Sequence, residues 1–246
     1  MSVPPLEIPV PSTILELAGG RAVEPVWLNG AGALTVRAGS GPGAVYIKHG
    51  PLDPETSAAG EAARLAWAAP YTPVPRVLEH GSDGTHEWLV TEALPYANAV
   101  ERRWLLDPGP AVRALGAGLR ALHEALPVYG CPFDWGVASR LNRLPPGAAA
   151  RLPEAPPIDR PVVCHGDACA PNTLLTESGD WAAHVDLGAL GVADRWADLA
   201  VASANLERNY GPGWEPAFFA AYGVTPDAQR LAYYRALWDA GDPPSA

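Results

Sequence analysis

The sequence predicts an α+β fold in two lobes: a small lobe with a five-stranded antiparallel sheet and one helix, then a larger, mainly helical lobe. Three observations predict it. Short strand-like segments between glycine-containing turns fill the first 92 residues, amphipathic patterns dominate after residue 98, and three short strands interrupt the helices between residues 162 and 186. We therefore expect an N-terminal lobe over 1–92, a hinge over 93–97 and a C-terminal lobe over 98–246.

The strands of the N-terminal lobe are predicted from period-two patterns and turn residues. Asn-Gly-Ala-Gly at residues 29–32 is typical of a hairpin turn between the first two strands. The third strand alternates, so that Val45 and Ile47 lie on one face and Tyr46 and Lys48 on the other. The predicted strands are residues 25–28, 33–38, 44–48, 74–80 and 87–92.

One helix is expected after the third strand, over residues 54–69. Thr56 or Ser57 can cap it, because short hydroxyl side chains accept hydrogen bonds from the first free amides of a helix. Its apolar face is predicted from residues at helical spacing. These residues are Ala58, Ala62, Leu65 and Ala66.

The C-terminal lobe is predicted to be helical. Residues 110–126 place valine and leucine at helical spacing after a proline in the first turn. Asp134 is expected to cap a helix that starts near residues 131–134. Residues 145–161 are rich in proline and predict an irregular loop. The last three helices are expected over 193–207, 214–222 and 226–238.

Composition excludes several classes of protein. The apolar fraction of 48% and charged fraction of 18% are typical of a globular chain, and a formal charge of −10 disfavours nucleic acid as a partner. There is no apolar run of the ~20 residues that a membrane helix needs, and the start lacks the pattern of a secretion signal. Three cysteines without metal-ligand spacing fit reduced thiols, so we expect a cytoplasmic protein. The sequence leaves the oligomeric state open.

The segment between residues 162 and 186 carries the chemistry. His-Gly-Asp at 165–167 is followed by Asn172, and a second strand leads into Asp186-Leu187-Gly188. Kinases need an acid that orients and deprotonates a hydroxyl, together with an asparagine and a second aspartate that hold magnesium on the phosphates of ATP. The order and spacing predict Asp167 as the catalytic residue that contacts the acceptor, and Asn172 and Asp186 as ligands of Mg²⁺. His165 is expected to be structural.

Lys48 and Glu61 are the expected phosphate-binding pair of the N-terminal lobe. A lysine at the end of a strand can reach the α- and β-phosphates, and a carboxylate on the next helix can hold it there. Gly30 and Gly32 sit in the first hairpin turn, where their backbone amides can cover the phosphates or where they simply supply positive φ angles. No Walker-type P-loop sequence occurs.

The base of the nucleotide has candidate contacts at the end of the N-terminal lobe. Tyr46 is expected to stack on adenine, the alternative being simple packing on the strand. Thr91 and Ala93, at the junction with the second lobe, are expected to offer the adenine edge a backbone carbonyl and an amide.

A metallohydrolase is the competing enzyme class. The sequence contains two His-x-Asp pairs, His165 with Asp167 and His184 with Asp186, and histidine with carboxylates binds zinc, manganese or iron. On a strand, residues two apart share a face, so the second pair could chelate one ion. This alternative leaves Asn172 without a role.

At these residues the chain resembles the aminoglycoside 3′-phosphotransferases, the kanamycin and neomycin kinases, which have a protein-kinase-like fold. The resemblance runs from about Val26 to Asp239. It implies ATP and magnesium as the phosphoryl donor system and an aminocyclitol hydroxyl as acceptor. The matching motifs are VYIK (45–48), EAARL (61–65), LRALH (119–123), CPFD (131–134), HGDAC (165–169), PN (171–172), DLG (186–188), GVADRW (191–196), DLA (198–200) and YYR (233–235).

The departures from that family fall where a substrate would bind. The family's acidic cluster after the DLA motif reads Asn-Leu-Glu-Arg-Asn at 205–209, so that Glu207 is its one carboxylate, and the acidic C-terminal end is reduced to Asp239. We expect both to contact a small cationic substrate, more weakly than a full cluster would. The alternatives are a kinase of the same fold for another antibiotic or an amino-alcohol metabolite, or a nucleotide-binding regulator without catalysis.

Overall fold

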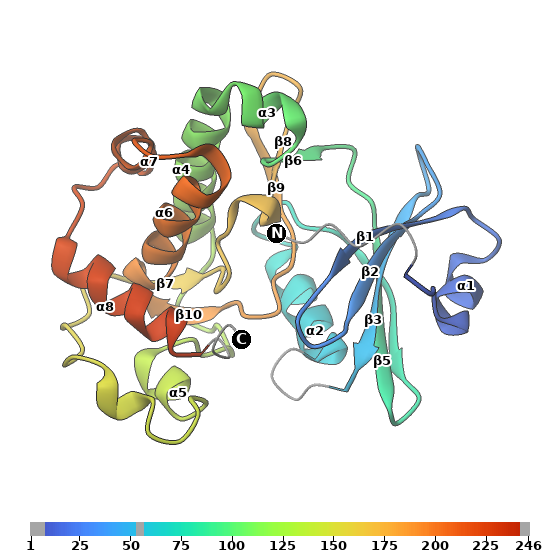
Figure 1. Cartoon of the computed structure of the whole chain (residues 1–246), viewed down its shortest axis with the longest axis horizontal. Helices are drawn as coiled ribbons and strands as arrows, with labels where there is room; N and C mark the ends of the chain where they lie inside the picture. Colours follow the sequence, from blue (N-terminus) through green and yellow to red (C-terminus); the bar gives the residue numbers. More distant parts are fainter. Residues whose placement is uncertain (1–7, 53–56, 242–246) are drawn as a thin grey trace. The chain divides into compact units, whose positions relative to one another are not determined.

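The computed structural model describes residues 8–52 and 57–241 (Figure 1). The chain folds as two compact units, one formed by residues 1–70 and 74–95 and the other by residues 71–73 and 96–246. No helix in the described ranges has the length and apolar character that a membrane span requires. Residues 53–56 and 242–246 lie outside the described part, so the start of the helix expected from residue 54 is not described.

The N-terminal unit contains the predicted five-stranded antiparallel sheet, in the order β1-β2-β3-β5-β4. The fourth strand begins at Val77 rather than at residue 74, because Pro75 has no amide hydrogen to donate to a neighbouring strand. The third strand extends past Lys48 to Pro51. The bounds are β1 Val23–Leu28, β2 Leu34–Ala38, β3 Val45–Pro51, β4 Val77–Ser82 and β5 His86–Glu92.

A helix covers each face of this sheet (Figure 1). The first, α1 (Ser12–Ala18), was not predicted from the sequence, and it packs on the face that carries Val45 and Ile47. The second, α2 (Ala58–Ala68), begins after Ser57, whose hydroxyl oxygen accepts a hydrogen bond from the Gly60 amide.

The apolar face of α2 differs from the predicted one at a single position. Ala58, Ala62 and Leu65 are buried as expected, but Ala66 is exposed and Ala68 is buried instead. Consecutive residues lie about 100° apart around a helix, so Ala66 turns away from the face that Leu65 buries.

The C-terminal unit is mainly helical. Its long helix, α4, packs along α7 and also contacts α6 (Figure 1). The short α3 was not predicted, and α6 begins three residues later than expected. The bounds are α3 Arg102–Leu106, α4 Pro108–Ala125, α5 Val137–Leu141, α6 Trp196–Tyr210, α7 Glu215–Tyr222 and α8 Ala228–Asp239, with short 3-10 turns at Ala149–Arg151 and Ala170–Asn172.

Two small antiparallel sheets hold residues 162–186 of this unit. This stretch carries the predicted site residues Asp167, Asn172 and Asp186, and it is called the catalytic segment below. β7 (Pro161–Cys164) pairs with β10 (Gly191–Asp194), and β6 (Ala97–Asn98) pairs with the hairpin of β8 (Thr173–Leu175) and β9 (Trp181–His184). The prediction of helix from residue 193 is therefore wrong. The β10 strand ends at Asp194, whose carboxylate accepts hydrogen bonds from the amides of Asp159 and Trp196, and the helix starts only beyond it.

The expected helix cap at Asp134 is also wrong. Asp134 forms an isolated bridge with Val192, and its carboxylate accepts the Gly136 amide at 2.8 Å in a turn. α5 begins one residue after Gly136. The proline-rich stretch is an irregular loop as predicted, apart from one 3-10 turn. Asp159 fixes its end by accepting hydrogen bonds from Arg195 and Trp196.

Close packing of α4 on α7 gives a test of this fold. A Cβ at Gly116 would lie 2.5 Å from the Phe218 carbonyl oxygen, whereas one at Gly109, in the same helix, would meet nothing closer than 3.4 Å. We expect Gly116→Ala to lower the free energy of unfolding by about 1–3 kcal/mol through overpacking. Gly109→Ala should be neutral or raise it by up to about 1 kcal/mol. Urea denaturation measures both, and equal effects would contradict the packing described.

Candidate active site

The lysine–glutamate pair predicted from the sequence forms within the N-terminal unit. Lys48 lies on β3 and Glu61 in the first turn of α2, and Nζ and Oε2 are 2.7 Å apart. The Glu61 side chain is 6% exposed, while that of Lys48 is 32% exposed. A carboxylate this buried needs its ion pair, because removing one partner of a buried pair leaves an uncompensated charge. The lysine is therefore held in place while part of it stays accessible.

Tyr46 and Thr91 lie on the same face of the sheet as Lys48. Tyr46 precedes the lysine by two residues on β3 and pairs with Thr91 on β5, and side chains two apart share a face. The amide of Ala93 donates a hydrogen bond to the Ala44 carbonyl at 2.9 Å. That amide therefore already has an acceptor inside the unit.

The hairpin glycines have different local reasons. Gly32 has a φ of 88°, which side chains rarely adopt, so the turn itself requires glycine there. Gly30 is not among the glycines with positive φ, and a Cβ there would meet no atom within 4 Å. Asn29 closes the turn by accepting the amides of Ala31 and Ala33.

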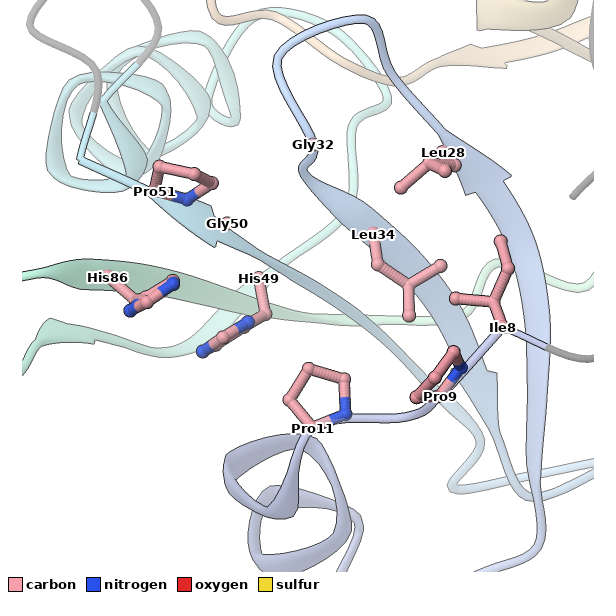
Figure 2. Close-up of a pocket in the computed structure, with 10 residues that line it drawn as sticks. All are labelled: Ile8, Pro9, Pro11, Leu28, Gly32, Leu34, His49, Gly50, Pro51 and His86. Carbon is pink, nitrogen blue, oxygen red and sulfur yellow. The ribbon is translucent and has the colours of Figure 1, made fainter.

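A small pocket in this unit lies on the other face (Figure 2). His49 follows Lys48 on β3 and therefore points to the opposite side, where its ring lies parallel to that of His86 with 5.3 Å between centroids. Burial and the neighbouring His86 lower the pKa of His49. The pocket has a volume of about 160 Å³ and does not include Lys48. Its lining is Ile8, Pro9, Pro11, Leu28, Gly32, Leu34, His49, Gly50, Pro51 and His86.

The catalytic segment of the C-terminal unit turns sharply after β7. Gly166 has a φ of 87°, and a Cβ there would lie 2.2 Å from the Ala189 carbonyl oxygen, so only glycine fits. The next residue, Asp167, is half-buried. The Asn172 side-chain amide donates to the carboxylate of Asp167 at 3.0 Å and to its carbonyl at 3.1 Å. The predicted base and the predicted metal ligand are thus in contact.

Asp186 lies at the end of the β8–β9 hairpin, next to Asn172. The Val185 amide donates to the Asn172 carbonyl at 3.0 Å, which sets the two metal-ligand candidates side by side. Among the described residues other than glycine, Asp186 alone has a positive φ, of 61°. Strained backbone of this kind is typical of functional positions. Burial and the nearby charge of Asp186 raise the pKa of Asp167 above its ordinary value.

His165 links the two acidic loops. Its Nε2 lies 3.0 Å from the Val185 carbonyl oxygen, and its Nδ1 accepts the Asp167 amide at 3.3 Å. A carbonyl only accepts and an amide only donates, so the imidazole carries its proton on Nε2. This arrangement agrees with the structural role expected for His165, since neither nitrogen is left to act as a base.

The metallohydrolase alternative is not supported by the described part of the chain. Within residues 8–52 and 57–241, one group of three ligand-type side chains lies close enough to hold a metal ion, and it consists of His123, Cys164 and Asp198. Neither His-x-Asp pair of the sequence belongs to it. Burial lowers the pKa of His184 well below its ordinary value, and its Nδ1 has no hydrogen-bond partner.

Asp198, on α6, is a site residue that was not predicted from the sequence. Its Oδ2 accepts the His165 amide at 2.6 Å and its Oδ1 accepts the Gly166 amide at 2.9 Å. Burial alone would raise the pKa of this carboxyl, but the hydrogen bonds from His123 and the backbone amides lower it. In the sequence Asp198 belongs to the DLA motif (198–200) and lies in the first turn of a helix with apolar neighbours, but neither feature assigned it a role.

The two carboxylates expected to contact a substrate are not engaged within the unit. Glu207 on α6 and Asp239 at the end of α8 are both exposed, and neither side chain forms a hydrogen bond or ion pair with another described residue. Neutral amides contact the catalytic segment instead. Asn205 accepts the Ala170 amide at 3.3 Å through its side-chain oxygen, and Asn209 donates to the Asn205 carbonyl at 2.9 Å.

Comparison with known proteins gives consistent matches. Residues 25–234 match the model of the phosphotransferase enzyme family. The chain is 37% identical over 227 residues to an aminoglycoside 3′-phosphotransferase of Streptomyces fradiae, covering 78% of this chain and 84% of the relative. It is 38% identical over 241 residues to one of Streptomyces ribosidificus, covering 84% of this chain and 90% of the relative.

A solved structure agrees in fold. The aminoglycoside phosphotransferase APH(3″)-Id of Streptomyces rimosus, in complex with ADP and streptomycin, superposes with a TM-score of 0.73. The two chains are 28% identical, and the match covers 94% of this chain and 97% of that one. This similarity confirms the fold class predicted from the sequence.

The anchoring role of Asp198 predicts a specific dependence of stability on pH. Its pKa is lowered in the folded state, so its contribution is present above the unfolded pKa of about 3.9 and is lost as the pH falls through the folded value. We expect Asp198→Asn to lower the free energy of unfolding by about 3 kcal/mol at pH 7, with the deficit shrinking below pH ~4. Urea denaturation from pH 7 to 3 measures this.

The matched control is Asp239→Asn, which changes an exposed aspartate of the same unit and should have little effect at any pH. A deficit for Asp198→Asn that stays constant down to pH 3 would show that the charge of Asp198 does not carry the interaction.

Proposed function

The chain belongs to the phosphotransferase enzyme family, and on this premise we propose that it transfers the γ-phosphoryl group of ATP to a hydroxyl of an aminoglycoside. Both Streptomyces relatives described above are named aminoglycoside 3′-phosphotransferases, which favours the 3′-hydroxyl and an outcome of antibiotic resistance. The observation that carries the proposal is the contact of Asp167 with Asn172 beside Asp186, in a chain that also forms the Lys48–Glu61 pair.

The N-terminal unit supplies the donor half of the proposed site. Lys48, fixed by Glu61, offers an ammonium group for the phosphates of ATP, and its partial exposure leaves it accessible. Tyr46 and Thr91 on the same face are the proposed neighbours of adenine. The amides of Gly30 and Gly32 are proposed to cover the phosphates. With the Ala93 amide in use, the Ala93 carbonyl remains as the proposed contact to the base.

The C-terminal unit supplies the acceptor half. Asp167 is proposed to orient the acceptor hydroxyl and take its proton as the phosphoryl group moves, and Asn172 holds its carboxylate for this. A carboxyl with a raised pKa is a stronger base when ionised, and it needs a pH above that pKa to act. His165 keeps the loop of Asp167 joined to the loop of Asp186.

The residues present fit a magnesium ion. Asn172 and Asp186 offer an amide oxygen and a carboxylate, the hard ligands that Mg²⁺ prefers, and the residue before Asp186, Val185, donates its amide to the Asn172 carbonyl. Burial raises the pKa of Asp167 and the nearby charge of Asp186 adds to the shift, so a cation placed beside these carboxylates would be stabilised. When bound, magnesium supplies that positive charge and neutralises the phosphates. We propose Asn172 and Asp186 as its ligands.

The small number of carboxylates proposed to bind the acceptor favours recognition of a narrow range of cationic substrates. The formal charge of −10 suits a cationic ligand, and Glu207 and Asp239 are the proposed carboxylates for its amines. Exposed ion pairs contribute only about 0–1 kcal/mol each, so two of them bind a polycation weakly. The three cysteines are free, which fits the cytosol, where ATP is available.

A screen of acceptors tests the proposed reaction. The purified chain with ATP and magnesium should release ADP in the presence of kanamycin or neomycin, and mass spectrometry should find one added phosphate on the drug. Chelation of magnesium should stop the reaction. Streptomycin and simple amino alcohols serve as alternative acceptors. ADP release with an amino alcohol and none with any aminoglycoside would contradict the proposed aminoglycoside substrate. The assignment of the protein as a kinase would still hold.

The assignment of Asp167 has a separate test. Asp167→Ala should lower kcat by about 100- to 10,000-fold, because loss of a positioned base removes that much. Its affinity for Mg-ATP should stay within a few-fold of wild type in titration calorimetry. Glu177→Ala, in the exposed hairpin turn of the same segment, is the control and should keep full activity. Undiminished turnover by Asp167→Ala would remove Asp167 from the chemistry.

A further inference from the structure

A buried chain of polar groups leads from α7 to the catalytic segment. The hydroxyl of Tyr222 on α7 lies 2.8 Å from Nδ1 of His123 on α4, and Nε2 of His123 lies 2.9 Å from Oδ2 of Asp198 on α6. All three residues are less than 5% exposed. Asp198 in turn accepts the amides of His165 and Gly166. Three helices are thus joined to the two residues before Asp167.

The partners set the direction of these hydrogen bonds. Asp198 accepts two backbone amides and is ionised, so His123 must donate to it from Nε2. Burial raises the pKa of Tyr222 to about 12, so the phenol keeps its proton and can donate it to Nδ1. Every group then has a partner, and a fully satisfied buried network is rigid. With Nε2 facing Asp198 and Nδ1 facing the phenol, the imidazole completes the chain.

Packing alone does not require these polar atoms. The ring of Tyr222 lies edge-on to His123, in a layer where Phe218 and Phe219 of the same helix are fully buried. A phenylalanine would fill the space of Tyr222 without a hydroxyl to satisfy. Burying a hydroxyl and an imidazole is favourable only when their hydrogen bonds form. We therefore attribute the presence of His123 and Tyr222 to the hydrogen bonds by which they hold the Asp198 carboxylate.

We propose that His123 and Tyr222 are positioning residues of the phosphotransferase: they lock the Asp198 side chain, and through it the backbone at His165 and Gly166, so that Asp167 stays aligned for phosphoryl transfer. The inference rests on the proposed function for its kinetic consequence. It adds two residues, in helices α4 and α7, that contact neither nucleotide nor acceptor in the proposed mechanism. A small displacement of a catalytic group lowers kcat steeply, while binding of ATP by other residues is spared.

Paired variants test this. Tyr222→Phe removes only the hydroxyl, His123→Leu removes both hydrogen bonds, and His123→Gln keeps an amide that can donate to Asp198. We expect kcat to fall by about 10-fold for Tyr222→Phe and about 100-fold for His123→Leu, with KM for ATP within two-fold of wild type. His123→Gln should recover part of the loss of His123→Leu. Tyr233→Phe, which removes a hydroxyl from a buried tyrosine of α8, is the control and should leave kcat unchanged.

Amide exchange gives a readout that does not depend on turnover. Hydrogen exchange at His165 and Gly166 should be at least ten-fold faster in Tyr222→Phe than in wild type or Tyr233→Phe. Unchanged exchange and unchanged kcat in both Tyr222→Phe and His123→Leu would overturn the proposal. If wild type phosphorylates no acceptor, the proposed function fails, and exchange alone decides: faster exchange supports the positioning role and unchanged exchange refutes it.

Discussion

The carboxylate of Asp198 is the constraint on which the catalytic segment depends. The chain must turn at Gly166 with a left-handed backbone, and that turn points two amides into the interior, away from strand partners. Buried amides without acceptors cost about 1–3 kcal/mol each, so an acceptor has to be brought from elsewhere in the chain. Asp198 meets that need from α6, and His123 helps to offset the cost of burying its charge. The position of Asp167 follows from this arrangement.

In the N-terminal unit, the sheet fixes the position of Lys48. Alternation along β3 sends Val45 and Ile47 to the face that α1 covers, and Tyr46 and Lys48 to the face that α2 covers. One face therefore forms the core, and the other can carry charge because Glu61 comes from the helix packed against it. Each unit thus uses a helix to hold a charged or polar group beside a predicted functional residue.

Two carboxylates, Asp167 and Asp186, lie near each other in the C-terminal unit. Asp167 and Asp186 lie close enough for one to raise the pKa of the other, and the Asn172 amide compensates for only part of their charge. Magnesium and a phosphate-bearing substrate complete such a site in the proposed reaction. Elsewhere, the neutral Asn205 contacts the catalytic segment and is itself contacted by Asn209.

The sequence by itself determined the fold class, the antiparallel sheet, the order of the motifs and the pairing of Lys48 with Glu61, because periodicity and spacing are local properties of the chain. It misplaced the start of α6 and the role of Asp134, since both depend on strands paired across long stretches of sequence. Only the tertiary structure decided that Asp198, His123 and Tyr222 converge, or that the Ala93 amide is already used. The physical reason is that a hydrogen bond between distant helices leaves no periodic trace in the sequence.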